Sequence, residues 1–264
     1  FTGEPSDMVL RPTDGGGGGI SLAGHWKYKV HVELGSEKYP VRPPQLRQHK
    51  CATVLYNAMI HPLIRFPIKG VVWYQGESNA DKPDEYRLLF PLLITTWRRL
   101  WKDEFPFYFV QLANYRAPQV EPFEDGWAEL RDAQRSTLSL PRTGMAVALD
   151  VGEAKSIHPR NKQEVGRRLG VIAQANVYGD AVPFSGPLYE SMRIEDDTMV
   201  LSFTHTYSGL CTPEGEPLRG FAIAGADKEY RWAEARIEGD TVVIGHPEIG
   251  EPRYAAYAWA NNPV

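Results

Sequence analysis

The fold is decided by the stretch KGVVWYQGESNA, residues 69–80. Its first half is a short apolar run, which is typical of a strand buried inside a parallel sheet. Its second half is a polar loop with two amides, a carboxylate and a hydroxyl around Gly76. Ligands of open α/β sheets bind at the carboxyl ends of the strands. The stretch therefore predicts a sheet strand and, directly after it, a candidate site.

Strand and helix patterns alternate downstream of this stretch. They predict a helix over 84–101, a strand over 107–112, a helix over 127–138, a strand over 144–151 and a helix over 161–178. Pro91 should kink or restart the first helix, and Asn161 with Glu164 forms a capping box for the last one. This order favours an α/β fold with a doubly wound, flavodoxin-like parallel sheet, and we place that domain at residues 51–182.

The two flanking regions have different patterns. Residues 183–264 contain short predicted strands over 192–195, 199–203, 221–224 and 241–244, with turn signals between them and no helix pattern, which predicts a small antiparallel β-domain. Residues 1–50 are rich in loops, with the glycine run 15–19, a predicted strand over 20–30 and a proline-rich linker near residue 40.

Composition excludes several classes of protein. The chain has 264 residues, a net charge of −4 and no basic segment, so nucleic acid is not an expected partner. No apolar stretch approaches the ~20 residues of a membrane span, so no membrane is expected either. Cys51 and Cys211 form neither a disulfide framework nor a metal-ligand spacing, and no pair of histidines or carboxylates has metal spacing. We expect no cofactor.

The loop after the first strand carries the first set of candidate residues. Gln75, Gly76 and Asn79 offer side-chain and backbone N–H donors, which could stabilise a developing oxyanion. The alternative is a tight polar turn whose side chains cap their own backbone.

His158 is the second candidate. It lies in the segment Ser156–Asn161, which follows a predicted strand and precedes a capped helix, as a reachable general base would. Alternatively, it only hydrogen-bonds a helix terminus. The similar His61-Pro62 lies in an apolar run, where we expect a structural role as a core residue.

Together these segments resemble the sialate O-acetylesterase family of the SGNH hydrolase group, over residues from about 20 to the end. The matching segments are LYNAMIHPL at 55–63, KGVVWYQGESNA at 69–80, PFYFVQLANY at 106–115, WAELR at 127–131, IHPRNKQEVGRRL at 157–169, SGPLY at 185–189 and GFAIAGAD at 220–227. The resemblance implies a carbohydrate O-acetylesterase that removes acetyl groups from hydroxyls of sialic acid or related glycans by serine-esterase chemistry. It also implies a periplasmic or secreted location.

Matching the family's motifs residue by residue implies the roles of the site. His158 would be the catalytic histidine, Gln75 the first side-chain oxyanion donor and Asn79 the second, while Gly76 would shape the loop. Many SGNH enzymes have an aspartate three residues before the histidine, where this chain has Lys155. Glu153 or Asp150 is a candidate to orient the ring instead, or a backbone carbonyl could serve a serine–histidine dyad.

The nucleophile is the second departure from the family's pattern. The family's serine lies in a Gly-Gln-Ser-Asn block well upstream, and no such block precedes residue 75. Ser78 imitates it at the place of the oxyanion loop, so we interpret Ser78 as a decoy. Residues 1–50 resemble the end of an inserted β-domain. The resemblance thus implies that the first sheet strand and the serine lie in an amino-terminal part of the same protein, outside this chain.

Two other hypotheses remain open. One is a self-contained hydrolase that uses Ser78 and His158. The other is a non-catalytic glycan-binding fragment in which Trp232 and Trp259 stack on sugars, although aromatic residues in alternating strands are usually part of a core.

Overall fold

The computed structural model describes residues 51–119, 121–122, 126–213 and 216–263, and the backbone of two short strands. These strands, β1 (Val9–Leu10) and β2 (Ile20–Ser21), pair antiparallel. The chain divides into two compact units, Phe1–His61 and Pro62–Val264. Beyond Ser21, the strand predicted over 20–30 lies outside the described residues, as does the glycine run.

The described end of the first unit is short and exposed. A π-helical turn, η3 (Tyr56–Ile60), has no buried residue and continues into the 3-10 turn η4 (His61–Leu63). His61 is exposed, with its ring edge-on to Tyr56 at 5.9 Å between centroids. The expectation that His61 is a core residue is therefore wrong. Cys51 is an exposed free thiol, as is Cys211 in the second unit.

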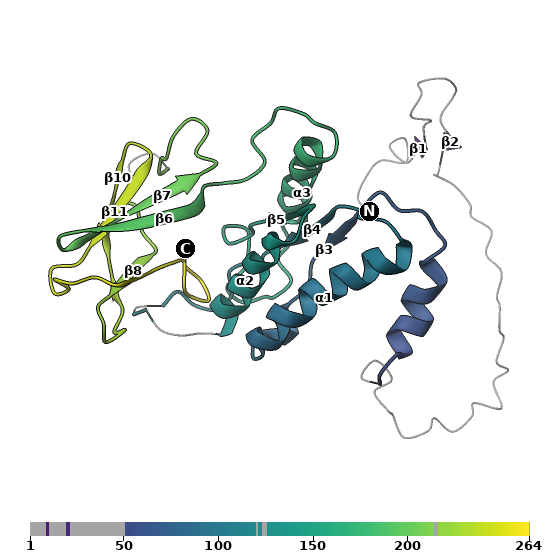
Figure 1. Cartoon of the computed structure of the whole chain (residues 1–264), viewed down its shortest axis with the longest axis horizontal. Coiled ribbons are helices and arrows are strands. Elements are labelled where there is room, and N and C mark those ends of the chain that lie inside the picture. The colour runs from purple at the N-terminus through teal and green to yellow at the C-terminus, as the bar shows by residue number, and fades with distance from the viewer. Residues whose placement is uncertain are drawn as a thin grey trace. The chain divides into compact units, whose positions relative to one another are not determined.

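A parallel sheet with helices on both faces forms the first part of the second unit, which confirms the predicted α/β class (Figure 1). The sheet has the order β3-β4-β5, with β3 (Val71–Trp73), β4 (Phe107–Val110) and β5 (Thr143–Ala146). The helices are α1 (Pro83–Trp101), α2 (Gly126–Ser136) and α3 (Lys162–Asn176). A 3-10 turn, η6 (Thr137–Ser139), follows α2.

The central strand β4 is buried on both faces because its side chains alternate between two helix layers. Phe107 and Phe109 belong to the cluster of Phe90 from α1 and Leu130 from α2. Tyr108 packs in a separate cluster with Ile172 of α3. Burying one such phenylalanine contributes about 1.5–3 kcal/mol, so the strand ties the two helix layers together.

The helix ends follow the sequence signals, with one difference. Asn161 caps α3, since its side chain accepts a hydrogen bond from Glu164 N at 3.2 Å. The helix α1 continues through Pro91 without a break in its residue range. Near its end, the buried Arg98 donates to the carbonyls of Phe105 and Arg142, at 3.1 Å each, and so ties α1 to the chain entering β4 and β5.

The rest of the second unit is built from antiparallel sheets. One has the order β10-β11-β7-β6 and the other the order β12-β8-β9. Their strands are β6 (Leu188–Glu195), β7 (Thr198–Thr204), β8 (Phe221–Ala224), β9 (Arg231–Trp232), β10 (Glu234–Glu238), β11 (Thr241–Gly245) and β12 (Tyr254–Tyr257). A core that includes Leu201, Ile223 and Ile244 joins them. The domain boundaries at residues 50 and 182 stay predictions.

Candidate functional site

The loop after β3 is held in place by hydrogen bonds to α1 and α2. The carbonyl of Gln75 accepts from Tyr86 Oη at 3.3 Å and from Gln134 Nε2 at 3.2 Å. The Gln75 side chain donates from Nε2 to Asn79 Oδ1 at 2.7 Å, across the 3-10 turn η5 (Glu77–Asn79). An amide nitrogen carries two N–H donors, so this bond orients the Gln75 amide and leaves it one donor for a ligand.

Gly76 is required by both its backbone and its surroundings. Its φ of +154° disfavours a side chain. A Cβ at this position would come within 3.0 Å of the Leu130 side chain and 3.1 Å of Gln134 Nε2. The loop therefore lies directly against α2.

Gln134 is a buried residue of the site that the sequence analysis missed. Its Oε1 accepts from Leu112 N at 2.9 Å, while Nε2 donates to the carbonyls of Gln75 and Val110. It thus joins the chain leaving β3 to the chain leaving β4. The sequence did contain a signal that Gln134 is buried, because Gln134 continues the apolar stripe of Trp127 and Leu130 on α2 at helical spacing.

His158 lies on the loop between β5 and α3, and its side chain is exposed. The loop is folded by local bonds: His158 N donates to Ser156 Oγ at 3.1 Å, and Arg160 N donates to Glu153 Oε1 at 2.8 Å. Pro159 is buried. A histidine on a fixed loop with an exposed ring has the placement that a general base needs.

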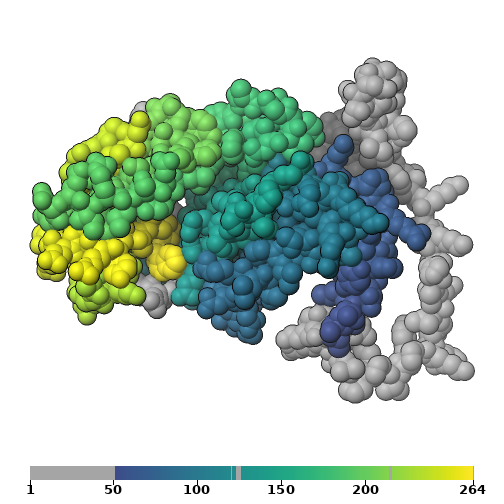
Figure 2. All heavy atoms as spheres, in the orientation of Figure 1, coloured from purple at the N-terminus to yellow at the C-terminus, as the bar shows by residue number. Residues whose placement is uncertain are grey.

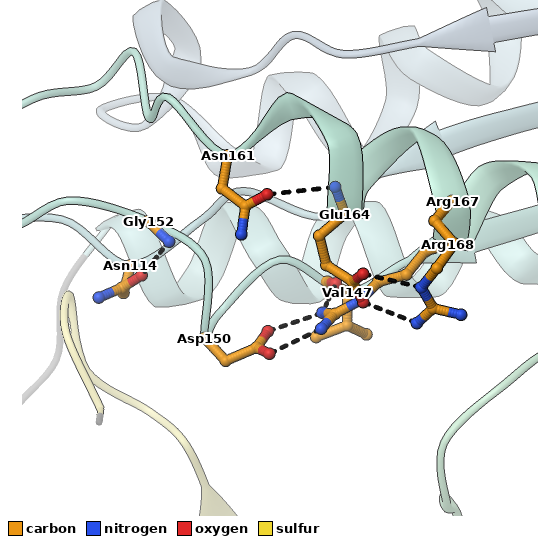
Figure 3. Close-up of polar contacts among 8 residues, drawn as sticks. All are labelled: Asn114, Val147, Asp150, Gly152, Asn161, Glu164, Arg167 and Arg168. Atoms are coloured by element: carbon orange, nitrogen blue, oxygen red, sulfur yellow. Dashed lines mark hydrogen bonds and ion pairs between the residues drawn. The ribbon is translucent and has the colours of Figure 1, made fainter.

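The two carboxylates considered as orienters of the His158 ring have other partners in this structure. Asp150 accepts two hydrogen bonds of 2.6 Å from Arg168, as Figure 3 shows. Hydrogen bonding to Arg168 lowers the pKa of Asp150. Glu153 bonds the backbone of Arg160. Both hold the loop, and their role at the ring stays a prediction.

The two candidate loops border one shallow hollow at the carboxyl ends of the strands, which has no enclosed room for a water molecule. Tyr74 and Glu77 line it from the first loop, and Ser156, Ile157 and Pro159 from the second. The remaining lining residues come from the chain after β4 and from α2: Ala113, Asn114, Tyr115 and Trp127. Burial, followed by the nearby Glu77 carboxylate, raises the pKa of Tyr74. The structure thus brings the loop that carries Gln75 and the loop that carries His158 to the same hollow.

The residues of the alternative hypotheses do not line this hollow. Ser78 is exposed on η5, and no hydrogen bond joins it to His158 within the described segments. Trp232 and Trp259 are both half-buried. Among the described residues, no three histidine, cysteine or carboxylate side chains gather as a metal ion would require. None of the helices seen there is long and apolar enough to cross a membrane.

Comparisons with known proteins identify relatives of this chain. Residues 42–175 match the family model described as carbohydrate esterase, sialic acid-specific acetylesterase. The chain is 40% identical over 236 residues to the sialate O-acetylesterase of Mus musculus, covering 80% of this chain and 43% of that protein. The sialate O-acetylesterase of Homo sapiens is 38% identical over 173 residues, which cover 58% of this chain and 33% of the human protein.

A solved structure is similar to the fold as well. It is a crystal structure described as a novel carbohydrate acetylesterase from Xanthomonas citri, with a TM-score of 0.75 and 42% identity. The match covers 79% of this chain and 49% of that one. The chain therefore spans about half or less of the length of these relatives. On this evidence, the chain belongs to the carbohydrate esterase family of the sialic acid-specific acetylesterases.

Proposed function

We propose that the protein to which this chain belongs removes acetyl groups from hydroxyls of sialic acid or related glycans. The observation that carries the proposal is the shared hollow, which places the Gln75 loop and the His158 loop at one edge of the sheet. His158 is the proton carrier and Gln75 the oxyanion donor, with Asn79 holding the Gln75 amide.

In this proposal a serine outside the chain supplies the nucleophile. Its Oγ attacks the acetyl carbonyl while His158 takes the proton, and the carbonyl electrons move to oxygen, where a Gln75 N–H stabilises the charge. Collapse of the tetrahedral intermediate breaks the bond to the sugar oxygen, which receives the proton from His158. Water then attacks the acetyl-serine with the same assistance and releases acetate.

The open edge of the sheet supports an additional strand beside β3. β3 is at one end of the strand order, and no strand among the described residues pairs with its outer edge. Val72 on this strand is 68% exposed, whereas its register partner Tyr108 on β4 is buried. An apolar strand edge that lacks a partner is normally covered in a folded protein. We propose that the amino-terminal part of the same protein pairs here and brings the serine.

The test compares this chain with a longer form that includes the upstream region, using an aryl acetate as substrate. We expect no hydrolysis by the chain alone and turnover by the longer form, or by the two parts mixed. His158→Ala should lower kcat of the longer form by roughly 10³-fold or more. Ser78→Ala should leave it unchanged. A longer form that keeps normal turnover without His158 would refute the assignment, and loss of activity in Ser78→Ala would favour the self-contained hydrolase.

A further inference from the structure

The segment after β12 folds back onto the α/β part of the second unit. Arg131 of α2 donates through Nη2 to the carbonyls of Ala258, at 2.9 Å, and Ala260. Tyr115 N donates to the carbonyl of Asn261 at 3.0 Å. Asn261 and its neighbour Asn262 are buried. In the space-filling view this segment is yellow and lies beside the teal residues of the α/β part (Figure 2).

A chain of three hydrogen bonds connects this segment to the loop that carries His158. Gly152 N donates to Asn114 Oδ1 at 2.8 Å, the contact drawn in Figure 3. Asn114 Nδ2 donates to Asn262 Oδ1 at 2.9 Å. Asn262 Nδ2 donates to the carbonyl of Arg116 at 2.9 Å. We call this set the amide relay.

The two backbone groups at the ends of the amide relay determine which atom of each asparagine donates and which accepts. It starts at a backbone N–H, which only donates, and it finishes at a backbone carbonyl, which only accepts. Each residue between them must accept on one side and donate on the other, as a side-chain amide does. A carboxylate at either asparagine position could only accept, and it would break one bond of the relay.

The His158 loop lies in close contact with Asn114. A Cβ on Gly152 would be 2.1 Å from Asn114 Oδ1 and 2.3 Å from its carbonyl oxygen, so only glycine permits this approach. A second tie follows along the loop, where Arg116 N donates to the carbonyl of Ala154 at 2.9 Å. The part of the loop that leads to His158 is therefore braced by the chain after β4, and Asn262 braces that chain in turn.

We propose that Asn114 is a positioning residue for His158, and that Asn262 keeps Asn114 in the orientation this requires. The antiparallel β-part of the protein then takes part in the active site through its last described residues, although none of the residues that line the hollow comes from it. This inference rests on the proposed function, because it takes His158 as the proton carrier.

The experiment uses the longer, active form of the protein with p-nitrophenyl acetate as the probe, together with amide hydrogen exchange followed by mass spectrometry. In Asn262→Ala, we expect kcat to fall roughly ten- to hundred-fold while KM changes less than about two-fold, because the base is displaced and substrate binding is not. Exchange should become faster in the peptide that covers residues 152–160.

Two further variants separate positioning from a general loss of structure. Asn114→Asp keeps an acceptor for Gly152 N but loses the donor to Asn262, so it should lower kcat as much as Asn262→Ala does. The double variant should be no worse than either single one, because both break the same relay. The matched control is Ile244→Val in the core of the β-part. It should leave both kcat and exchange at residues 152–160 unchanged.

The inference is overturned if Asn262→Ala and Asn114→Asp keep normal kcat. It is equally overturned if the faster exchange spreads over β7 and β11 while residues 152–160 stay protected, since Asn262 would then only stabilise the β-part. Failure of the proposed function has a different signature, namely His158→Ala with normal turnover. In that case the exchange measurement still reports whether the amide relay holds the loop.

Discussion

Gly76 and Gln134 each stabilise the loop after β3 through specific neighbours. Gly76 leaves room for the Leu130 side chain, and Gln134 makes buried hydrogen bonds to the backbone. The sequence predicted the importance of Gly76 from its loop after a buried strand, and it predicted an exposed ring at His158. It did not predict Gln134 or Asn114. Their hydrogen-bond partners lie on other elements, and a polar residue at a buried position has no local signal that names its partner.

Replacing Gly76 with alanine should destabilise the fold by about 1–3 kcal/mol, because the new methyl group meets Leu130 and the backbone is strained at this φ. Urea denaturation of the chain would measure the free energy of unfolding. Gly166→Ala is the matched control. Its Cβ meets nothing within 4 Å on the exposed side of α3, and it should stabilise by roughly 0.4–1 kcal/mol.

Replacing Gln134 with methionine should cost about 2–4 kcal/mol, since the buried N–H of Leu112 and two carbonyls would lose their partner while the volume stays similar. The same change at the exposed Gln163 should alter the free energy of unfolding by less than about 0.5 kcal/mol. A similar effect at both positions would show that the buried bonds contribute little.

The first turns of α3 hold the loop that carries His158. Arg168 joins Glu164 in the first turn to Asp150 on the loop, with N–O distances of 2.6–2.8 Å. Hydrogen bonds from Arg167 and then Arg168 lower the pKa of Glu164 from 4.5 to about 2. The capping box at Asn161 was readable from the sequence because it is local, whereas the ion pair with Asp150 spans 18 positions and was not.

Acidification should weaken this ion-pair cluster in a defined direction. Because the pKa of Glu164 is lower in the folded state, its stabilisation is complete above about pH 4.5 and is lost as the pH falls toward about 2. Asp150 contributes with the same sign. We therefore expect Arg168→Gln to lose less stability than the unmodified chain between pH 5 and pH 2.5. Arg193→Gln, which removes an exposed pair on β6, should show the unmodified pH dependence.

The helices and strands also show which elements a local sequence pattern can predict and which it cannot. The helices α1, α2 and α3 and the strands β3, β4 and β5 were predicted by type, because each helix has an apolar periodicity and each strand a continuous apolar run. The short strands β9, β10 and β12 were not predicted. β9 has only two residues, and they form a strand because they pair with β8. Pairing with a distant segment leaves no pattern in the local sequence.

At the scale of the whole molecule, the outer edge of β3, which no described strand covers, should make the isolated chain associate with itself. Exposed apolar side chains on this edge strand and on α1, among them Val72 and Leu88 at 68% and 74% exposure, favour pairing with another chain. Val72→Lys should reduce the association seen by light scattering. Tyr178→Lys is the control, since Tyr178 is equally exposed just beyond α3 and away from the sheet edge. Equal effects would exclude the edge as the cause.

The order of an α/β part followed by antiparallel sheets was predictable from the sequence, since each part has its own periodicity. The return of the segment after β12 to the α/β part was not. Asn114 and Asn262 are 148 positions apart, and two asparagines at that separation carry no pattern that relates them. The periplasmic or secreted location stays a prediction.

The separation of Asn114 from Asn262 sets an order of events during synthesis. A ribosome makes the His158 loop well before it makes residue 262, and domains begin to fold from their amino-terminal side as they emerge. The parallel sheet can assemble early, because its contacts are close along the chain. The loop gains this tether only after the segment after β12 has been released from the exit tunnel, so the histidine is set in place later than the parallel sheet that carries its loop.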